Sequence, residues 1–308
     1  MPEAENVQMK YEGKAVADGT SIEFSGLAEA LIRQKKMGKT IIGVLDDRAF
    51  DGKEIPADLS LKHITDTWGQ DPDISLTPLD ANQIRSYSII YKAAVDILVF
   101  PYGSIFPMDA YPLFSAQWLM YFIEKGGSVL TSGGIPFISQ AHNNGSVIAT
   151  EDAESLLSAY DKWGGKFGVK FYPRTAACDY EVFDNEFLPS LKNFKATPPQ
   201  FGIVVNNSSH YPVPVPSNGN VFPERYPAKQ VIPLSWSEDK YGQIVAVTGI
   251  LTQDYETGST RIHFSHENKQ HPLSPSNPDF TQTMDELKYL LLNKIIAGEI
   301  ECKYACYK

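Results

Sequence analysis

The chain has 308 residues, of which 43% are hydrophobic and 21% are charged, and its formal net charge is -10. This composition is typical of a globular protein with one large domain or two ordinary ones. The negative charge disfavours nucleic acid and anionic membranes as partners, and no apolar run approaches the ~20 residues of a membrane span.

The first half of the chain alternates between apolar runs and segments with helical periodicity. A helix closed by Gly38 is predicted over 27–38, and four strands are predicted over 40–46, 74–79, 96–101 and 128–132. Helical patterns also cover 58–70, 81–94, 111–127 and 150–165. The strand in "VDILVFPYG" shows no apolar–polar alternation, as expected where both faces are covered. The pattern predicts an α/β fold with an open, doubly wound parallel sheet.

The second half changes character. Residues 196–230 are rich in Pro and aromatic side chains and are predicted to form long loops around short strands. Antiparallel strands are predicted over 231–268, and an amphipathic helix over 281–297. We therefore expect an N-terminal extension (1–38), an α/β core (39–170) and a loop- and β-rich extension with a C-terminal helix (171–308). We expect this extension to pack on the same domain.

Candidate binding residues follow the predicted strands, because ligands of open parallel sheets bind beyond the carboxyl ends of the strands. Glycines after these strands would let a ligand lie close to the backbone, and their N–H groups could bind an anion or an oxyanion. The alternative interpretation is that these glycines only form sharp turns between a strand and a helix. A neutral or weakly polar ligand is expected, since Arg48 is the only basic residue nearby, and neither a metal nor a cofactor is required. The candidates are Asp47, Tyr102, Gly103, Ser104, Ser132, Gly133 and Gly134.

Three stretches carry a family resemblance: "VDILVFPYGSIFP", the helix end "FIEKGG" and "SVLTSGGIPF". They resemble the class I glutamine amidotransferase-like superfamily, in a non-amidotransferase branch similar to the β-galactosidase trimerisation domain and related domains of bacterial carbohydrate-processing proteins. The resemblance covers residues 39–165 and, more loosely, 229–270. It implies a flavodoxin-like sheet and a role beside carbohydrate-degrading enzymes.

The resemblance also bears on catalysis. The true amidotransferases carry a Cys nucleophile on a sharp turn after a strand, and the matching turn here, "LTSGGIPF", has no Cys. Cys178 lies too far along the chain to take that place. The resemblance therefore implies that glutaminase activity is absent.

Histidines, acids and cysteines offer further candidates. In "RIHFSHENKQH", strand alternation would place His263 and Ser265 on one side and His266 on the other; a metal site is one interpretation, and surface histidines on a loop the favoured one. Acidic pairs at 46–47 and within 179–186 suit either glycosidic hydrolysis or helix capping. The three cysteines, one at position 178 and two near the C-terminus, are expected to be free thiols and not a zinc site.

Two functions remain open. The first is a non-catalytic module of a carbohydrate-processing system that binds glycans or contributes contacts to a homo-oligomer, with Trp163 and Trp236 serving as core residues. The second is a hydrolase that uses Ser104 or Ser132, Asp47 and a histidine. The start "MPEAENVQMK" shows no signal peptide, so an extracellular or periplasmic location rests on the resemblance and a cytoplasmic one is the alternative.

Overall fold

The structure is a computed structural model of the chain, and it describes parts of both predicted halves. The described residues are 20–45, 61–80, 83, 95–101, 105–107, 122–123, 125–134, 139–141, 147–149, 169–173, 180–183, 187–199, 201–205, 229–242, 244–254, 258–266, 272–274 and 276–293. The helices predicted over 81–94, 111–127 and 150–165 lie wholly or mostly outside these residues.

The described residues form a few helices and many strands. The helices are α1 (Thr20–Lys36), α2 (Leu61–Thr67), the 3-10 turns η3 (Trp68–Gln70) and η5 (Pro189–Leu191), and α6 (Phe280–Leu292). One large sheet contains β1 (Thr40–Leu45), β2 (Ile74–Leu79), β3 (Ile97–Phe100), β5 (Ser128–Ser132), β8 (Val169–Pro173), β9 (Tyr180–Val182), β10 (Phe201–Val205), β11 (Lys229–Glu238), β12 (Ile244–Asp254) and β13 (Thr260–Phe264). A small sheet contains β4 (Ile105–Pro107), β6 (Ser139–Ala141) and β7 (Val147–Ala149).

Five strands of the large sheet run parallel, in the order β2-β1-β3-β5-β13. Every residue of β3, β5 and β13 is buried, which is the pattern of strands covered on both faces. The strands predicted over 40–46, 74–79, 96–101 and 128–132 correspond in that order to β1, β2, β3 and β5, and their parallel pairing confirms the α/β prediction.

The strand order fixes where a ligand crevice is expected. Counted along the chain, the five parallel strands are arranged 2-1-3-4-5, which is the order of flavodoxin-like doubly wound sheets. The chain winds outward from β1 to β2 and then returns past β1 to β3. The switch point therefore lies between β1 and β3, and the loops that leave these two strands are the ones that border the crevice in such folds.

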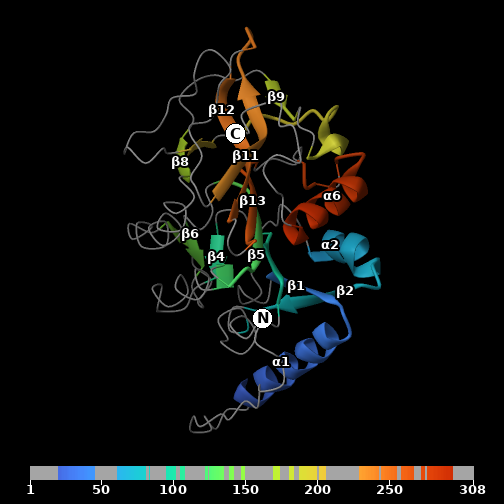
Figure 1. Cartoon of the computed structure of the whole chain (residues 1–308). Helices are drawn as coiled ribbons and strands as arrows, with labels where there is room; N and C mark the ends of the chain where they lie inside the picture. The colour runs from blue at the N-terminus through green and yellow to red at the C-terminus, as the bar shows by residue number, and fades with distance from the viewer. Residues whose placement is uncertain are drawn as a thin grey trace.

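Strand β13 joins this parallel part to an antiparallel part. It pairs antiparallel with β12, which also pairs with β11 and β10, and the short strand β9 pairs with β11. Figure 1 shows β11 and β12 above β5 and β13, with β1 and β2 below. The antiparallel strands were predicted, but the parallel pairing of β13 with β5 was not, because a single strand pattern does not reveal which neighbour it will find.

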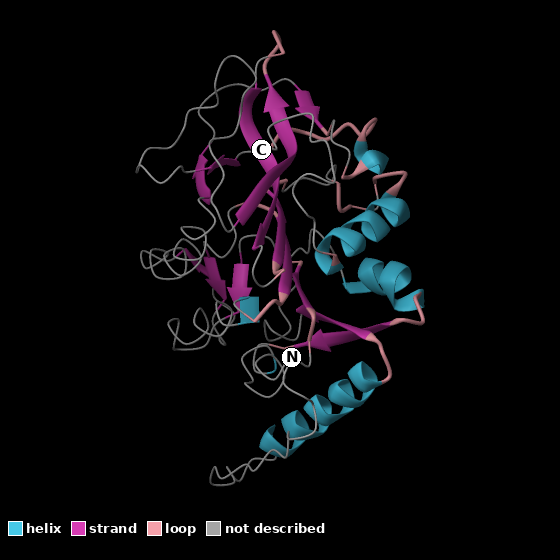
Figure 2. Cartoon of the chain, viewed as in Figure 1, coloured by secondary structure: helices cyan, strands magenta, loops and turns pink. Residues whose placement is uncertain are grey.

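Helices α2 and α6 lie side by side on one side of the sheet (Figures 1 and 2). Trp68 Nε1, at the end of α2, donates to the carbonyl of Met284 in α6 at 2.8 Å. Ser128 Oγ in β5 donates to the carbonyl of Leu291 at 2.8 Å, which ties α6 to the sheet. The main hydrophobic core fills the space between these helices and the strands, with Trp68 and Phe264 fully buried within it.

Helix α1 packs against β1 at the other end of the sheet from the antiparallel strands. Its residues Ala28 and Leu31 are buried. Asp96 connects the two elements, since one carboxylate oxygen lies 2.7 Å from Lys35 Nζ and the other accepts the Ile41 N–H at 2.9 Å. The predicted end of this helix is confirmed at Gly38, which has a φ of 83°.

The close packing of β12 on β13 can be tested at Gly249. A Cβ atom there would lie 2.5 Å from Ser235 Oγ and 2.7 Å from the ring of Phe264. We expect Gly249→Ala to lower the free energy of unfolding by about 1–3 kcal/mol through overpacking. Urea denaturation is the measurement.

The control is Gly26→Ala in α1, where a Cβ would meet nothing within 4 Å. Because alanine favours helix, this variant should gain roughly 0.5–1 kcal/mol. A Gly249→Ala protein as stable as the wild type would contradict the packing described for these strands.

Candidate functional site

The turn after β5 is closed by the neighbouring strand. Gly133 and Gly134 have φ values of 83° and 55°, which glycine tolerates better than other residues. The Gly133 N–H donates to the Phe264 carbonyl at 2.7 Å, and the Gly134 N–H donates to the Ser265 carbonyl at 3.1 Å. Both amides predicted as anion or oxyanion donors are thus engaged within the sheet, which favours the interpretation of this glycine pair as a turn.

Ser132, the candidate nucleophile at this turn, is buried with 1% of its surface exposed. Its Oγ has no hydrogen-bond partner in the described part of the chain. A serine nucleophile needs a base within hydrogen-bond reach, and among the described residues no histidine or carboxylate makes that bond. The other candidates, Asp47, Tyr102, Gly103 and Ser104, lie outside the described residues.

His263 is buried on β13, on the side of the strand that faces this turn. Its Nδ1 lies 2.9 Å from Thr131 Oγ1, and its Nε2 lies 3.0 Å from the Gly134 carbonyl and 3.3 Å from Ser265 Oγ. A carbonyl can only accept, so Nε2 carries the proton and Nδ1 accepts from Thr131. Desolvation lowers the pKa of His263 to about 3. The neutral ring therefore ties the turn to β13.

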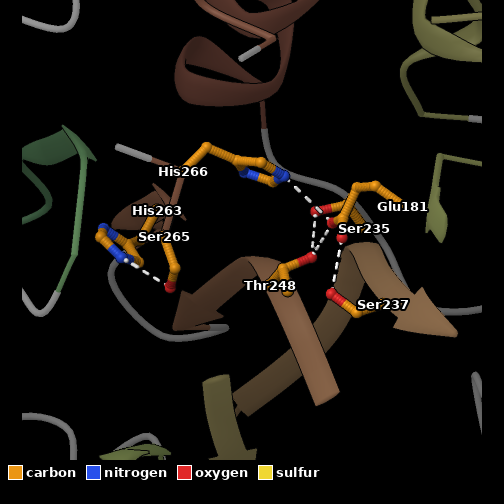
Figure 3. A network of polar contacts seen from close by, with 7 residues as sticks. All are labelled: Glu181, Ser235, Ser237, Thr248, His263, Ser265 and His266. Carbon is orange, nitrogen blue, oxygen red and sulfur yellow. Dashed lines mark hydrogen bonds and ion pairs between the residues drawn. The ribbon is translucent and has the colours of Figure 1, made fainter. Parts of the chain in front are cut away.

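A second polar cluster lies beyond the end of β13, where His266 meets Glu181 of β9. The two side chains are fully buried, and His266 Nε2 lies 3.0 Å from Glu181 Oε1. Ser237 Oγ donates to Glu181 Oε2 at 2.6 Å, and Thr248 Oγ1 donates to Oε1. Figure 3 shows these side chains converging on the carboxylate, with Ser235 beside Thr248. We call Glu181, Ser235, Ser237, Thr248 and His266 the Glu181 network.

The Glu181 network resolves an energetic problem of burial. An ionised carboxylate removed from water costs several kcal/mol unless donors surround it. Two hydroxyl donors provide that compensation for Glu181, and His266 Nε2 lies 3.0 Å from Oε1 without making a hydrogen bond to it. Because these side chains come from β11, β12 and the residues just after β13, the carboxylate fastens the short strand β9 to all three elements.

His266 has a carboxylate beside one ring nitrogen, as a catalytic base does, but no nucleophile at the other. Its ring stacks on Phe183 at a centroid separation of 5.7 Å, and a carboxylate lies next to one ring nitrogen. Its Nδ1 has no partner in the part of the chain that the structure describes, and neither has Ser132 Oγ, so the two do not bond to each other. The geometry therefore orients an imidazole without presenting it to a nucleophile.

The histidine predictions have a mixed outcome. The alternation is confirmed, because His263 contacts Ser265 whereas His266 turns to Glu181. The surface-loop interpretation is wrong for both, which are 2% and 1% exposed. His263 is buried because β13 lies between β5 and β12, and His266, just after β13, packs on Phe183 beside Glu181. The acidic cluster 179–186, which contains Glu181, was interpreted from the sequence as suited to glycosidic hydrolysis or helix capping, and its contact with His266 was not anticipated. The available signal was the alternation of Ser235 and Ser237 around Trp236, which indicates polar residues on one face of a strand.

The described residues contain no group of three or more His, Cys, Asp or Glu side chains placed to hold a metal ion. None of their helices has the length and apolar character needed to cross a membrane.

Removing the buried carboxylate should be costly. In Glu181→Ala, the hydroxyls of Ser237 and Thr248 lose their shared acceptor, and His266 Nε2 loses the carboxylate beside it. We expect a loss of about 3–5 kcal/mol in the free energy of unfolding, measured by urea denaturation. The control is Asp285→Ala, which removes a carboxylate 58% exposed from its contact with Lys288 and should cost less than about 1 kcal/mol. Equal effects of both variants would contradict the buried network.

The depressed pKa of His263 predicts a pH dependence of stability. The folded group titrates at about 3 and its ordinary value is 6.5, so between these values the unfolded chain binds more protons. This contribution to stability is complete above pH 6.5 and is lost as the pH falls toward 3. The slope from this residue is at most about 1.4 kcal/mol per pH unit.

Urea denaturation at a series of pH values measures this slope. The comparison is His263→Gln, whose amide can accept from Thr131 and donate to the Gly134 carbonyl without titrating. The variant should lose less stability on acidification than the wild type. Parallel stability–pH curves for the two proteins would show that His263 is not buried in its neutral form.

Comparison of the chain with protein-family models finds no match, and comparison with curated proteins finds none either.

Proposed function

We propose that the chain is a non-catalytic, amidotransferase-like module of a carbohydrate-processing system that acts in glycan binding or assembly. The observation that carries the proposal is the state of the β5 turn: Ser132 Oγ contacts no base in the described part of the chain, and the amides of Gly133 and Gly134 are engaged within the sheet. Serine hydrolysis needs both an activated hydroxyl and open oxyanion donors. Binding needs neither.

The strand order supports a binding role at a neighbouring place. Asp47 follows β1 and Tyr102 follows β3, which are the two strands that flank the switch point. Ligands of doubly wound sheets bind in the crevice beyond such strand ends. The glycan and the extracellular or periplasmic location come from the resemblance to domains of carbohydrate-processing proteins. Contacts between copies of the chain would serve the assembly role.

The alternative function is a glycosidase- or esterase-type hydrolase at the same edge of the sheet. One observation favours it: a buried carboxylate lies 3.0 Å from one ring nitrogen of His266, where a triad carboxylate lies beside its base. It would require a movement that brings the Ser132 hydroxyl into contact with the open Nδ1 of His266. The described contacts contain no such bond, and we therefore place this function second.

The two functions are separated by binding and activity measurements on one set of proteins. Calorimetric titration with neutral mono- and oligosaccharides should detect binding by the wild type. Hydrolysis of aryl glycosides and aryl esters, and ammonia release from glutamine, should stay at background for the wild type and for Ser132→Ala. A hydrolysis rate that Ser132→Ala or His266→Ala abolishes would establish the hydrolase instead, and the absence of any sugar binding would remove the glycan role.

A further inference from the structure

The outer face of β9 and β11 exposes aromatic rings beside a fixed carboxylate. Tyr180 in β9 is 59% exposed, and Tyr241, in the turn that joins β11 to β12, is 75% exposed. Glu238 ends β11 between them in the chain path. We propose that Tyr180, Glu238 and Tyr241 form a platform that binds neutral pyranose units of an oligosaccharide. The inference rests on the proposed function and assigns its glycan to a place away from the strand-end turn.

Strand pairing puts the first two members of the platform on one face. Tyr180 is directly opposite Glu238 in the antiparallel pair of β9 and β11, and directly opposed residues project to the same side of a sheet. Trp236 shares that side, two residues earlier on β11, and its Nε1–H donates to Glu238 Oε1 at 2.7 Å. The indole thus fixes the carboxylate. The second oxygen, Oε2, has no hydrogen-bond partner within the described residues and lies 3.8 Å from where a Cβ on Gly242 would stand.

The third member sits on an ordered turn. The Tyr241 N–H donates to Asp239 Oδ1 at 2.8 Å, and the Gly242 N–H donates to the Asp239 carbonyl at 3.0 Å. Gly242 has a φ of 74°, which suits the tight reversal. Lys240 Nζ lies 4.9 Å from the centre of the Tyr241 ring, on one of its faces. Because the backbone of this turn is already held by hydrogen bonds, a ligand that binds to it loses little free energy in ordering the chain, which favours affinity.

Strand β9 is held in place from its other side. Glu181 follows Tyr180, so its side chain projects to the opposite face, where the Glu181 network buries it. A strand of three residues with one described partner strand gains little from its ladder alone. The buried carboxylate therefore anchors the strand that presents Tyr180. Because successive side chains of β9 project to opposite faces of the sheet, the pairing that buries Glu181 also exposes Tyr180.

The chemistry of the platform selects a neutral sugar. A pyranose has an apolar face of C–H groups that stacks on an aromatic ring, and equatorial hydroxyls at its rim. The open oxygen of Glu238 can accept from such hydroxyls, and a charged acceptor makes the stronger hydrogen bonds. Anionic ligands are disfavoured by Glu238, by Asp239 and by the net charge of -10. Because the rings are exposed and not enclosed in a pocket, several linked sugar units should bind better than one.

The experiment compares exposed tyrosines. Wild type and variants are titrated by calorimetry with hexasaccharides of β-1,4-glucose, β-1,3-glucose, β-1,4-xylose, β-1,4-mannose and α-1,4-glucose. For the hexasaccharide that binds the wild type, we expect Tyr180→Ala and Tyr241→Ala each to raise the dissociation constant by about tenfold or more. Glu238→Gln keeps an acceptor for Trp236 but loses the charge, and it should raise the constant by about threefold to tenfold.

The matched control is Tyr289→Ala, because Tyr289 is 63% exposed on α6, away from the platform. It should leave the dissociation constant unchanged, and all four variants should unfold at the same urea concentration as the wild type, since each changes a surface side chain. Sugar binding that survives Tyr180→Ala together with Tyr241→Ala would overturn the platform. If that binding were lost in Tyr102→Ala, the proposed function would stand with its site at the strand ends. A wild type that binds none of the sugars would contradict both.

Discussion

Strand β13 is the constraint on which the rest of the structure depends, because it is paired on both edges in opposite senses. It runs parallel to β5 and antiparallel to β12, and every one of its residues is buried. The side chains on each of its two faces therefore have a fixed environment. Ile262 and Phe264 enter the core beneath α6, whereas His263 faces the turn after β5. One strand thus determines the position of the antiparallel part, the closure of the β5 turn and the direction in which His266 leaves the sheet.

The Glu181 network extends from the end of β13 to β9 at the edge of the sheet and fixes the position of that short strand. Strand β9 contributes three residues and pairs with β11, so backbone hydrogen bonds alone would hold it weakly. A carboxylate buried among Ser237, Thr248 and His266 changes this balance, since moving β9 away would leave several polar groups unpaired in an apolar region. The buried hydrogen bonds of Glu181 in this way fix the position of the strand. Its outward residue, Tyr180, then has a defined place although it makes few contacts of its own.

Local patterns in the sequence were enough for four of the five parallel strands and insufficient for the polar networks. Strands β1, β2, β3 and β5 were predicted because short, largely apolar segments alternate there with helical patterns, and α6 because its apolar residues recur at helical spacing. The contact of Glu181 with His266 depends on two long-range pairings, of β9 with β11 and of β13 with β5, that no local pattern encodes. The histidines were assigned to a surface loop because the three-residue spacing of His263 and His266 puts them on opposite faces of a strand, which disfavours a shared metal site. In the structure His263 is instead neutral and hydrogen-bonded on both ring nitrogens, which makes burial affordable.

Burial at the carboxyl edge of β5 and β13 has a chemical consequence. A desolvated site strengthens electrostatic interactions and favours catalysis when a nucleophile, a base and open amide donors meet there. Where they do not meet, the same desolvation favours neutral groups with satisfied hydrogen bonds, and this is the state of His263 and of the Gly133 and Gly134 amides. Freeing the Gly133 and Gly134 amides for a ligand would require breaking their bonds to the Phe264 and Ser265 carbonyls, which lie at the junction between the two parts of the sheet. Binding on the outer face of β9 and β11 requires no such change, because its carboxylate and its turn are already held by Trp236 and Asp239.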